Sequence, residues 1–147
     1  MSFVSRKFMA LTKKQIQEII NYWKEGSNHD WGTAQSLWNS KRYDACLFFC
    51  HLTLEKLLKG LVVERTQKAA PYIHDLAELL KITSILDKQQ MKRMAVFTGF
   101  NMKCRYSNVK LAFYKLCTRE FTKPYFKEAE ELILWLKTFY QKDKLII

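Results

Sequence analysis

The sequence predicts an all-α protein, an up-and-down four-helix bundle with one or two extra short helices. Three observations favour this fold class. Apolar residues recur at intervals of three and four, the spacing of one helix face, along most of the 147 residues. Only 4 Gly and 2 Pro interrupt the chain, so we expect few turns and long elements. Apolar residues make up 48% of the chain, which is enough for one core and a single domain over residues 1–147.

The first helix is expected over residues 13–39, after a loose arm formed by residues 1–11. Thr12 suits the N-cap position because its hydroxyl can accept a hydrogen bond from a free backbone N–H group. Gly26 and Gly32 each weaken a helix by about 1 kcal/mol relative to alanine. Two helices are therefore an alternative here, and we favour one. The apolar residues of its first half lie on one face: Ile16, Ile19, Ile20 and Trp23.

The second helix is expected over residues 41–67, after a short polar turn. Apolar residues nearly encircle it, which is typical of the central helix of a bundle. Glu55 and Lys59 are four residues apart and of opposite charge, so they can pair on one face of this helix.

The second half of the chain is expected to hold two more long helices and a short one. A short helix over 74–83 opens with His74 and Asp75, where a negative side chain favours a helix N-terminus. A long helix follows over 87–103. Residues 104–121 form the least regular part, with a brief helical turn over 111–116.

The last helix is expected over 123–142. Thr122 would cap its N-terminus, and Pro124 would lie in its first turn, where a missing N–H group does no harm. The connections along the chain are short enough for antiparallel neighbours, which is the arrangement of an up-and-down bundle.

Charge and cysteine content narrow the class of protein. With 25 basic and 14 acidic residues the net charge is +11, which attracts polyanions or an acidic partner. A basic surface with no specific partner is an equal alternative. The four cysteines contain no C-x-x-C pair, so we interpret them as core thiols in a reducing cytoplasm and expect no metal site. No apolar run is long enough to span a membrane, and the N-terminus lacks the pattern of a signal peptide.

Four short motifs occur in order along the chain. The first helix carries Asp30, Ala34 and Leu37 before the turn into Tyr43. The second helix carries Glu-Lys-x-Leu-Lys at residues 55–59. A His-Asp-Leu-x-x-Leu box occupies residues 74–79, and an Arg-Tyr pair occupies residues 105–106. In this order the set resembles the HEPN family, small helical domains found beside or fused to minimal nucleotidyltransferases. The resemblance covers about residues 16–140.

The resemblance has direct implications for function. It implies a homodimer with a cleft, and a binding subunit of a two-protein, toxin–antitoxin-like module that holds a nucleotidyltransferase, a nucleotide or RNA. The binding residues would be Arg105, Tyr106, His74, Asp75, Lys56 and Lys59. The chain departs from the family pattern after Arg105–Tyr106, where residues 107–108 are Ser-Asn in place of the usual Pro-Asp.

The RNase members of the family use an arginine followed, after four to six residues, by a histidine. No arginine of this chain has a histidine at that separation. We therefore assign no catalytic residue and no cofactor, and we expect a binding protein. The alternative is a divergent, metal-independent RNase that acts across a dimer cleft. In that case Arg105 would stabilise the phosphate and His74 would move protons, since histidine is the side chain that titrates near neutral pH. A purely structural interaction protein is a third hypothesis.

Overall fold

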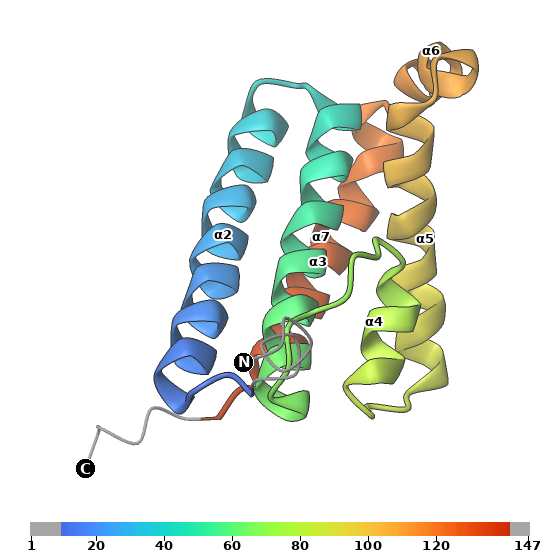
Figure 1. Cartoon of the computed structure of the whole chain (residues 1–147). Helices are drawn as coiled ribbons and strands as arrows, with labels where there is room; N and C mark the ends of the chain where they lie inside the picture. The colour runs from blue at the N-terminus through green and yellow to red at the C-terminus, as the bar shows by residue number, and fades with distance from the viewer. Residues whose placement is uncertain (1–9, 142–147) are drawn as a thin grey trace.

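The computed structural model describes residues 10–141, and these form a bundle of four long helices with two shorter ones. The helices run α2 (Lys13–Asn39), α3 (Tyr43–Thr66), α4 (Leu76–Ile82), α5 (Lys88–Arg105), α6 (Ser107–Leu116) and α7 (Arg119–Lys137). The long helices α2, α3, α5 and α7 alternate in direction, and α6 crosses one end of the bundle (Figure 1). The predicted all-α bundle is therefore confirmed. The predicted arm over 1–11 falls almost entirely outside the described residues.

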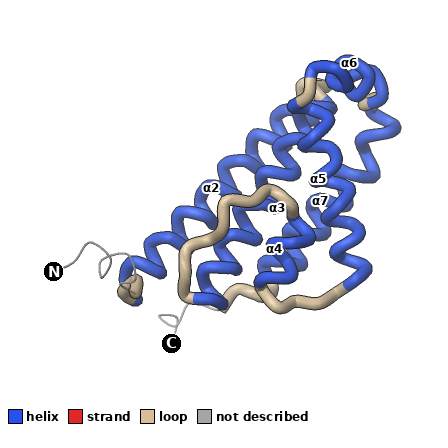
Figure 2. The backbone as a smooth tube through the Cα atoms, turned by 45° about the vertical axis from the view of Figure 1, so that its right-hand side comes forward, coloured by secondary structure: helices blue, strands red, loops and turns tan. Residues whose placement is uncertain are grey.

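Helix α3 is the centre of the bundle, as its apolar circumference predicts. It packs against α2, α4, α5, α6 and α7. Fourteen of its residues are buried. The loop from α3 to α4 crosses the face of α3 before the chain turns into α4 (Figure 2). This crossing brings the His74 segment onto the middle of α3.

The first helix is continuous, and its two glycines do not break it. Thr12 caps it in a reciprocal arrangement with Gln15, in which the hydroxyl accepts from the Gln15 N–H group and the Gln15 side chain accepts from the Thr12 N–H group. At Gly26 an added Cβ would lie 3.1 Å from Cδ of Lys56. Gly26 therefore leaves room for the stem of a lysine that crosses from α3.

Two predictions for the region before the last helix are wrong. Residues 107–116 form a regular helix, α6, because Phe113 is buried against the bundle and anchors it there. Helix α7 begins at Arg119 rather than at residue 123, because the Thr118 hydroxyl, and not that of Thr122, accepts the capping bond from the Phe121 N–H group at 3.1 Å. Pro124 consequently lies inside α7.

The core joins the long helices through aliphatic and aromatic side chains. Trp31 and Trp38 of α2 both stack on Phe126 of α7, with ring centroids 5.2 and 5.0 Å apart. These tryptophans therefore serve packing between helices. Cys46, Cys50 and Cys117 are buried, and no cysteine of the described residues forms a disulfide.

Candidate functional site

A network of ionisable side chains lies where the His74 segment crosses α3. Helix α3 contributes His51, Glu55 and Lys59 at intervals of four residues, so they follow one another along one side of the helix. All three are buried. The loop before α4 contributes His74, whose side chain is 50% exposed. The network therefore combines three buried ionisable side chains of α3 with one imidazole, that of His74, which reaches the surface.

Glu55 is the centre of this network. Its Oε1 accepts a hydrogen bond from Nδ1 of His74 at 2.9 Å, and its Oε2 lies 3.2 Å from Nζ of Lys59. The side chains of Glu55 and Lys59 are each only 8% exposed. A buried carboxylate needs partners on both oxygens, and these two side chains supply them.

His51 of α3 makes a second hydrogen bond to the loop that carries His74. A carbonyl oxygen can only accept, so Nε2 of His51 carries a proton and donates it to the His74 carbonyl at 2.9 Å. Its Nδ1 is buried without a hydrogen-bond partner, 3.9 Å from Oε1 of Glu55. Burial lowers the pKa of His51, and the nearby positive charge of Arg105 adds a smaller effect in the same direction. His51 therefore favours the neutral form.

The same argument shows which ring nitrogen of His74 carries a proton. The Glu55 carboxylate accepts at Nδ1, so that nitrogen carries the proton whether the ring is neutral or charged. Nε2 of His74 is left available: as a neutral nitrogen it accepts from a hydroxyl, and once protonated it donates to a phosphate. This arrangement, a carboxylate that orients an imidazole, is the one by which enzymes hold a general base.

The other predicted site residues are spread over the molecule. Asp75 is the N-cap of α4, where it accepts from the Glu78 N–H group at 3.2 Å. Lys56 turns away from His74, with Nζ 2.6 Å from Oδ2 of Asp30. Lys59 joins the network as the partner of Glu55, and its ammonium also lies 5.4 Å from the ring centroid of Trp23. Both lysines are thus engaged within the fold.

Arg105 and Tyr106 lie at the junction of α5 and α6, and both are exposed. Among the described residues no carboxylate lies within 4.0 Å of the Arg105 guanidinium. Arg105 therefore forms no ion pair with Glu55 or Asp75 in this part of the chain. Arg105 is close enough to His51 to influence its pKa, so both predicted site segments face the same region of α3.

The thiols of Cys104 and Cys117 lie in surroundings that keep them protonated. Burial, with the charge of Asp44, raises the pKa of Cys104 to about 11 and that of Cys117 to about 12. At neutral pH such thiols stay protonated and unreactive. Residues 10–141 hold no group of three or more side chains arranged as metal ligands. They also hold no helix that is long and apolar enough to cross a membrane.

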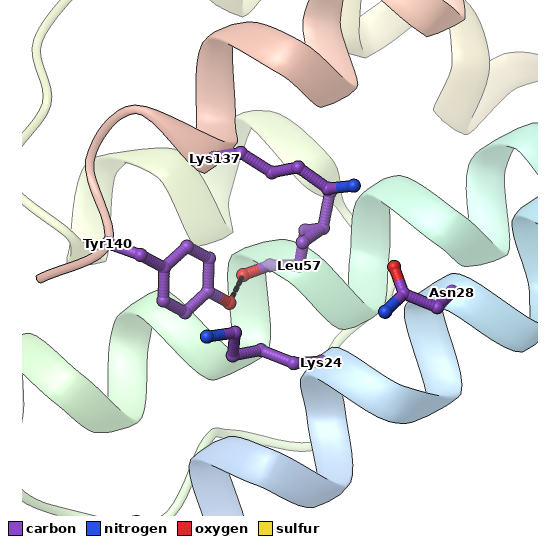
Figure 3. A pocket seen from close by; sticks show the side chains of 5 residues that line it. All are labelled: Lys24, Asn28, Leu57, Lys137 and Tyr140. Atoms are coloured by element: carbon purple, nitrogen blue, oxygen red, sulfur yellow. Dashed lines mark hydrogen bonds between the residues drawn. The ribbon is translucent and has the colours of Figure 1, made fainter. Parts of the chain in front are cut away.

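A cavity of about 270 Å³ lies apart from this network, between α2, α3 and the end of α7. Lys24, Asn28, Leu57, Lys137 and Tyr140 line it (Figure 3). Its aromatic wall is fixed in place, because the Tyr140 hydroxyl donates to the Leu57 carbonyl at 2.5 Å. Sequence reasoning missed this cavity, since its residues share no motif and meet only through packing.

Sequence reasoning did not include His51 among the candidate site residues. The signal that could have found it is the spacing His51, Glu55, Lys59, three ionisable residues on one side of a helix whose middle is largely apolar. Buried charged groups are retained only where they are paired, so such a row predicts a network.

Comparison with known proteins identifies the family. The model of the HEPN domain matches residues 20–139, which is most of the chain. The chain belongs to the HEPN family. This match spans all the helices from α3 to α7 and most of α2, so it includes both the His74 network and the Arg105 junction.

A solved structure supports the fold. The chain is similar to the protein TT1696 from Thermus thermophilus, seen in a crystal structure, with a TM-score of 0.68 and 18% sequence identity. The alignment covers 81% of this chain and 96% of that one. At this identity the likeness concerns the HEPN fold alone. The search of curated proteins found no match.

Proposed function

We propose that this HEPN domain is the RNA- or nucleotide-binding subunit of a two-protein module, and that phosphate groups of the ligand bind at His74 and Arg105. The observation that carries the proposal is the pair formed by His74 and Glu55. A buried carboxylate holds one ring nitrogen at 2.9 Å, which leaves the other nitrogen on a half-exposed side chain. A fold gains little from orienting an exposed imidazole edge so firmly, whereas a ligand site gains specificity.

Arg105 supplies the second element of this site. Its planar guanidinium can donate two parallel hydrogen bonds to a phosphate, which a lysine ammonium cannot do. It is exposed, and in the described part of the chain it is not used in an ion pair. The net charge of +11 adds a long-range attraction for polyanions.

The second protein of the module would be a nucleotidyltransferase. HEPN domains of the kind that this chain resembles occur beside minimal nucleotidyltransferases, and this sequence has no phosphate loop of its own. The proposal predicts that a nucleotidyltransferase encoded next to this chain co-purifies with it, in the manner of toxin–antitoxin pairs. If this chain purifies without a second protein, its function would be limited to RNA or nucleotide binding by this chain alone.

The binding proposal is tested by fluorescence anisotropy with a labelled RNA at two salt concentrations. We expect Arg105→Ala and His74→Ala each to weaken binding about ten-fold, through loss of a charge-assisted hydrogen bond. Lys14→Ala is the matched control, because it removes one positive charge near the N-terminus of α2, at the end of the bundle remote from α6 (Figure 1). Equal losses in all three variants would reduce the site to general electrostatics and refute the proposal.

A divergent RNase is the second candidate function, and the Glu55–His74 geometry favours it specifically. In that mechanism Nε2 of His74 takes the proton of a ribose 2′-hydroxyl, and the 2′-oxygen attacks the phosphorus while Arg105 stabilises the charge on the phosphate. The bond from phosphorus to the 5′-oxygen breaks, the 5′-oxygen leaves with a proton supplied by water, and a 2′,3′-cyclic phosphate remains on the other fragment. The test is a denaturing gel of labelled tRNA and mRNA incubated with wild type, Arg105→Ala and Glu55→Gln. Cleavage that both substitutions abolish would establish the RNase. Intact RNA at high protein concentration would leave binding as the function, and toxicity on overexpression would be absent.

A further inference from the structure

One stretch of the chain carries positive charge without any negative charge. Residues 88–119, which include all of α5 and α6, contain eight lysines and arginines and no aspartate or glutamate. This segment therefore holds eight of the eleven net charges of the chain in less than a quarter of its length. Its basic residues are Lys88, Lys92, Arg93, Lys103, Arg105, Lys110, Lys115 and Arg119.

The fold neutralises only a small part of this charge. Arg93 of α5 pairs with two carboxylates of α7, Glu128 at 2.7 Å and Glu131 at 2.9 Å. The other ion pairs recorded among the described residues all lie outside this segment. The charge of α6 and of the junction before it is thus left facing solvent.

Helix α6 contacts the bundle on one side only. It packs on α5 and on α3, with Phe113 as its buried residue. Two pairs of exposed residues lie beside or opposite Phe113 on this helix, each pair four positions apart and therefore adjacent: Lys110 with Tyr114, and Leu111 with Lys115. At the start of α6, Tyr106 is 57% exposed, and near its end Tyr114 is 60% exposed. We call these five residues the α6 surface.

Tyr106 and Tyr114 are large exposed aromatic rings that lie on the same short helix segment as two exposed lysines. Buried area would stabilise these rings, yet nothing in residues 10–141 covers them. Rings separated by basic side chains are the arrangement by which proteins hold single strands, since lysines neutralise phosphates while unstacked bases lie on the rings. A duplex keeps its bases stacked on one another and would use only the charges.

We propose that the α6 surface is a binding site for single-stranded nucleic acid, in which bases stack on Tyr106 and Tyr114 and the backbone is neutralised by Lys110 and Lys115. The inference rests on the proposed function, because it names the form of the RNA and a second place where it binds. Arg105, adjacent to Tyr106, connects the α6 surface with the His74 site. A nucleic-acid strand bound along α6 would therefore extend past Arg105 towards the Glu55–His74 pair.

The test measures binding of a labelled single-stranded RNA, a DNA of the same sequence and the matching duplex. We expect Tyr114→Ala to weaken single-strand binding about five-fold or more, the range of one lost base–aromatic stack. Tyr114→Phe keeps the ring and should bind as wild type. Tyr22→Ala is the matched control, because Tyr22 is a similarly exposed tyrosine on α2, 66% exposed. Circular dichroism confirms that each variant is folded.

The charges are tested separately from the rings. Binding weakens as salt rises, so the slope of log affinity against log salt is negative. The double variant Lys110→Gln/Lys115→Gln should make this slope shallower by about 1.4, since each neutralised phosphate of a single strand contributes about 0.7. Lys13→Gln/Lys14→Gln, at the start of α2, should leave the slope unchanged. Polyglutamate should compete poorly with the RNA, because it offers charge without bases.

Each outcome bears on one proposal or on both. Weaker single-strand binding by Tyr114→Ala with full binding by Tyr114→Phe supports the α6 surface, whether RNA and DNA bind equally or RNA binds better. Wild-type affinity in Tyr114→Ala and in the double lysine variant overturns the α6 surface, and the His74–Arg105 site then stands on its own variants. Effective competition by polyglutamate, or equal binding of duplex, also overturns it in favour of an acidic partner or a general electrostatic effect. Absence of any RNA binding by wild type overturns both proposals.

Discussion

At the scale of single residues, Glu55 decides how the His74 site is built. One carboxylate with an 8% exposed side chain holds the imidazole of His74 and the ammonium of Lys59. Removing one partner of a buried ion pair leaves the other charge without compensation in a region that water does not reach. The stability of the site and the orientation of the His74 ring therefore both depend on the carboxylate of Glu55.

Glu55→Gln should lower the free energy of unfolding by about 3 kcal/mol, because it leaves Lys59 buried and uncompensated. Urea denaturation followed by circular dichroism measures this change. The matched control is Glu78→Gln, which removes an exposed pair with Lys81, at 3.2 Å, and should change stability by less than about 0.5 kcal/mol. Similar losses in the two variants would contradict a special role of Glu55.

His51 makes a second residue-scale prediction, on pH. Burial lowers its pKa in the folded protein, so below about 6.5, the pKa of a free histidine, the unfolded chain binds more protons than the folded one. Stability should therefore fall as the pH decreases from 7.5 towards 5, down to the lowered pKa of the folded state. Glu55, His74 and Arg105 are the charged groups that influence this ring.

The measurement is the difference in pH dependence between wild type and His51→Gln, from urea denaturation at a series of pH values. The variant should lose the part of the decline that His51 causes. His29→Gln is the control, because the side chain of His29 is 83% exposed. Parallel curves for wild type and His51→Gln would show that the buried imidazole is not responsible.

At the scale of elements, close approach between helices depends on glycine at one position of α3. A Cβ added at Gly60 would collide with the Tyr140 hydroxyl and would lie 3.3 Å from Cβ of Trp23. Gly60 thus lets Tyr140 and α2 approach α3 closely, and Tyr140 forms a wall of the cavity (Figure 3). Such overpacking is relieved only by moving a helix or a ring.

Gly60→Ala should destabilise the fold by about 1–3 kcal/mol, the range for overpacking a core. Gly99→Ala on α5 meets no atom within 4 Å and should stabilise by up to about 1 kcal/mol, because alanine is the better helix former. Thermal unfolding of the two variants gives the comparison. If both substitutions stabilise, Tyr140 is not held against α3 as described.

At the scale of the whole molecule, the distribution of charge matters more than its sum. The segment 88–119 has only positive charges, whereas the remaining residues carry 17 basic and 14 acidic side chains. Exposed apolar residues also remain on the outside, for example Leu134 of α7 at 59% exposure. The side of the molecule that α5 and α6 form is therefore suited to a polyanion, and other faces are available for contact with a second chain.

The family resemblance predicts a homodimer. Light scattering after size-exclusion chromatography should give a mass of about twice the 17.6 kDa of the chain. The mass should stay at that value on dilution to micromolar concentration, because a two-fold interface of apolar helix faces is stable at that level. A mass of one chain throughout the dilution series would contradict the prediction.

The sequence alone determined the fold class, the existence of the four long helices, the cap at Thr12 and the place of Asp75 at the N-terminus of a short helix. These features are local: they depend on apolar periodicity and on side chains that bond backbone groups three residues away. The prediction failed at α6, because Ser107 and Asn108 are typical of turns and Phe113 becomes an anchor only once a bundle exists to bury it.

Only the tertiary structure decided which chemistry-bearing residues meet. Motif order brought His74 and Arg105 forward as candidates, but it did not show that Glu55 holds His74, that His51 supports the loop, or that Lys56 turns to Asp30. These contacts join residues about 20 or more positions apart, and their geometry follows from how helices pack rather than from any local pattern. Charge composition indicated a polyanion, an acidic partner or no specific partner, and the packing of α6 on the bundle decided where that charge and its neighbouring rings are exposed.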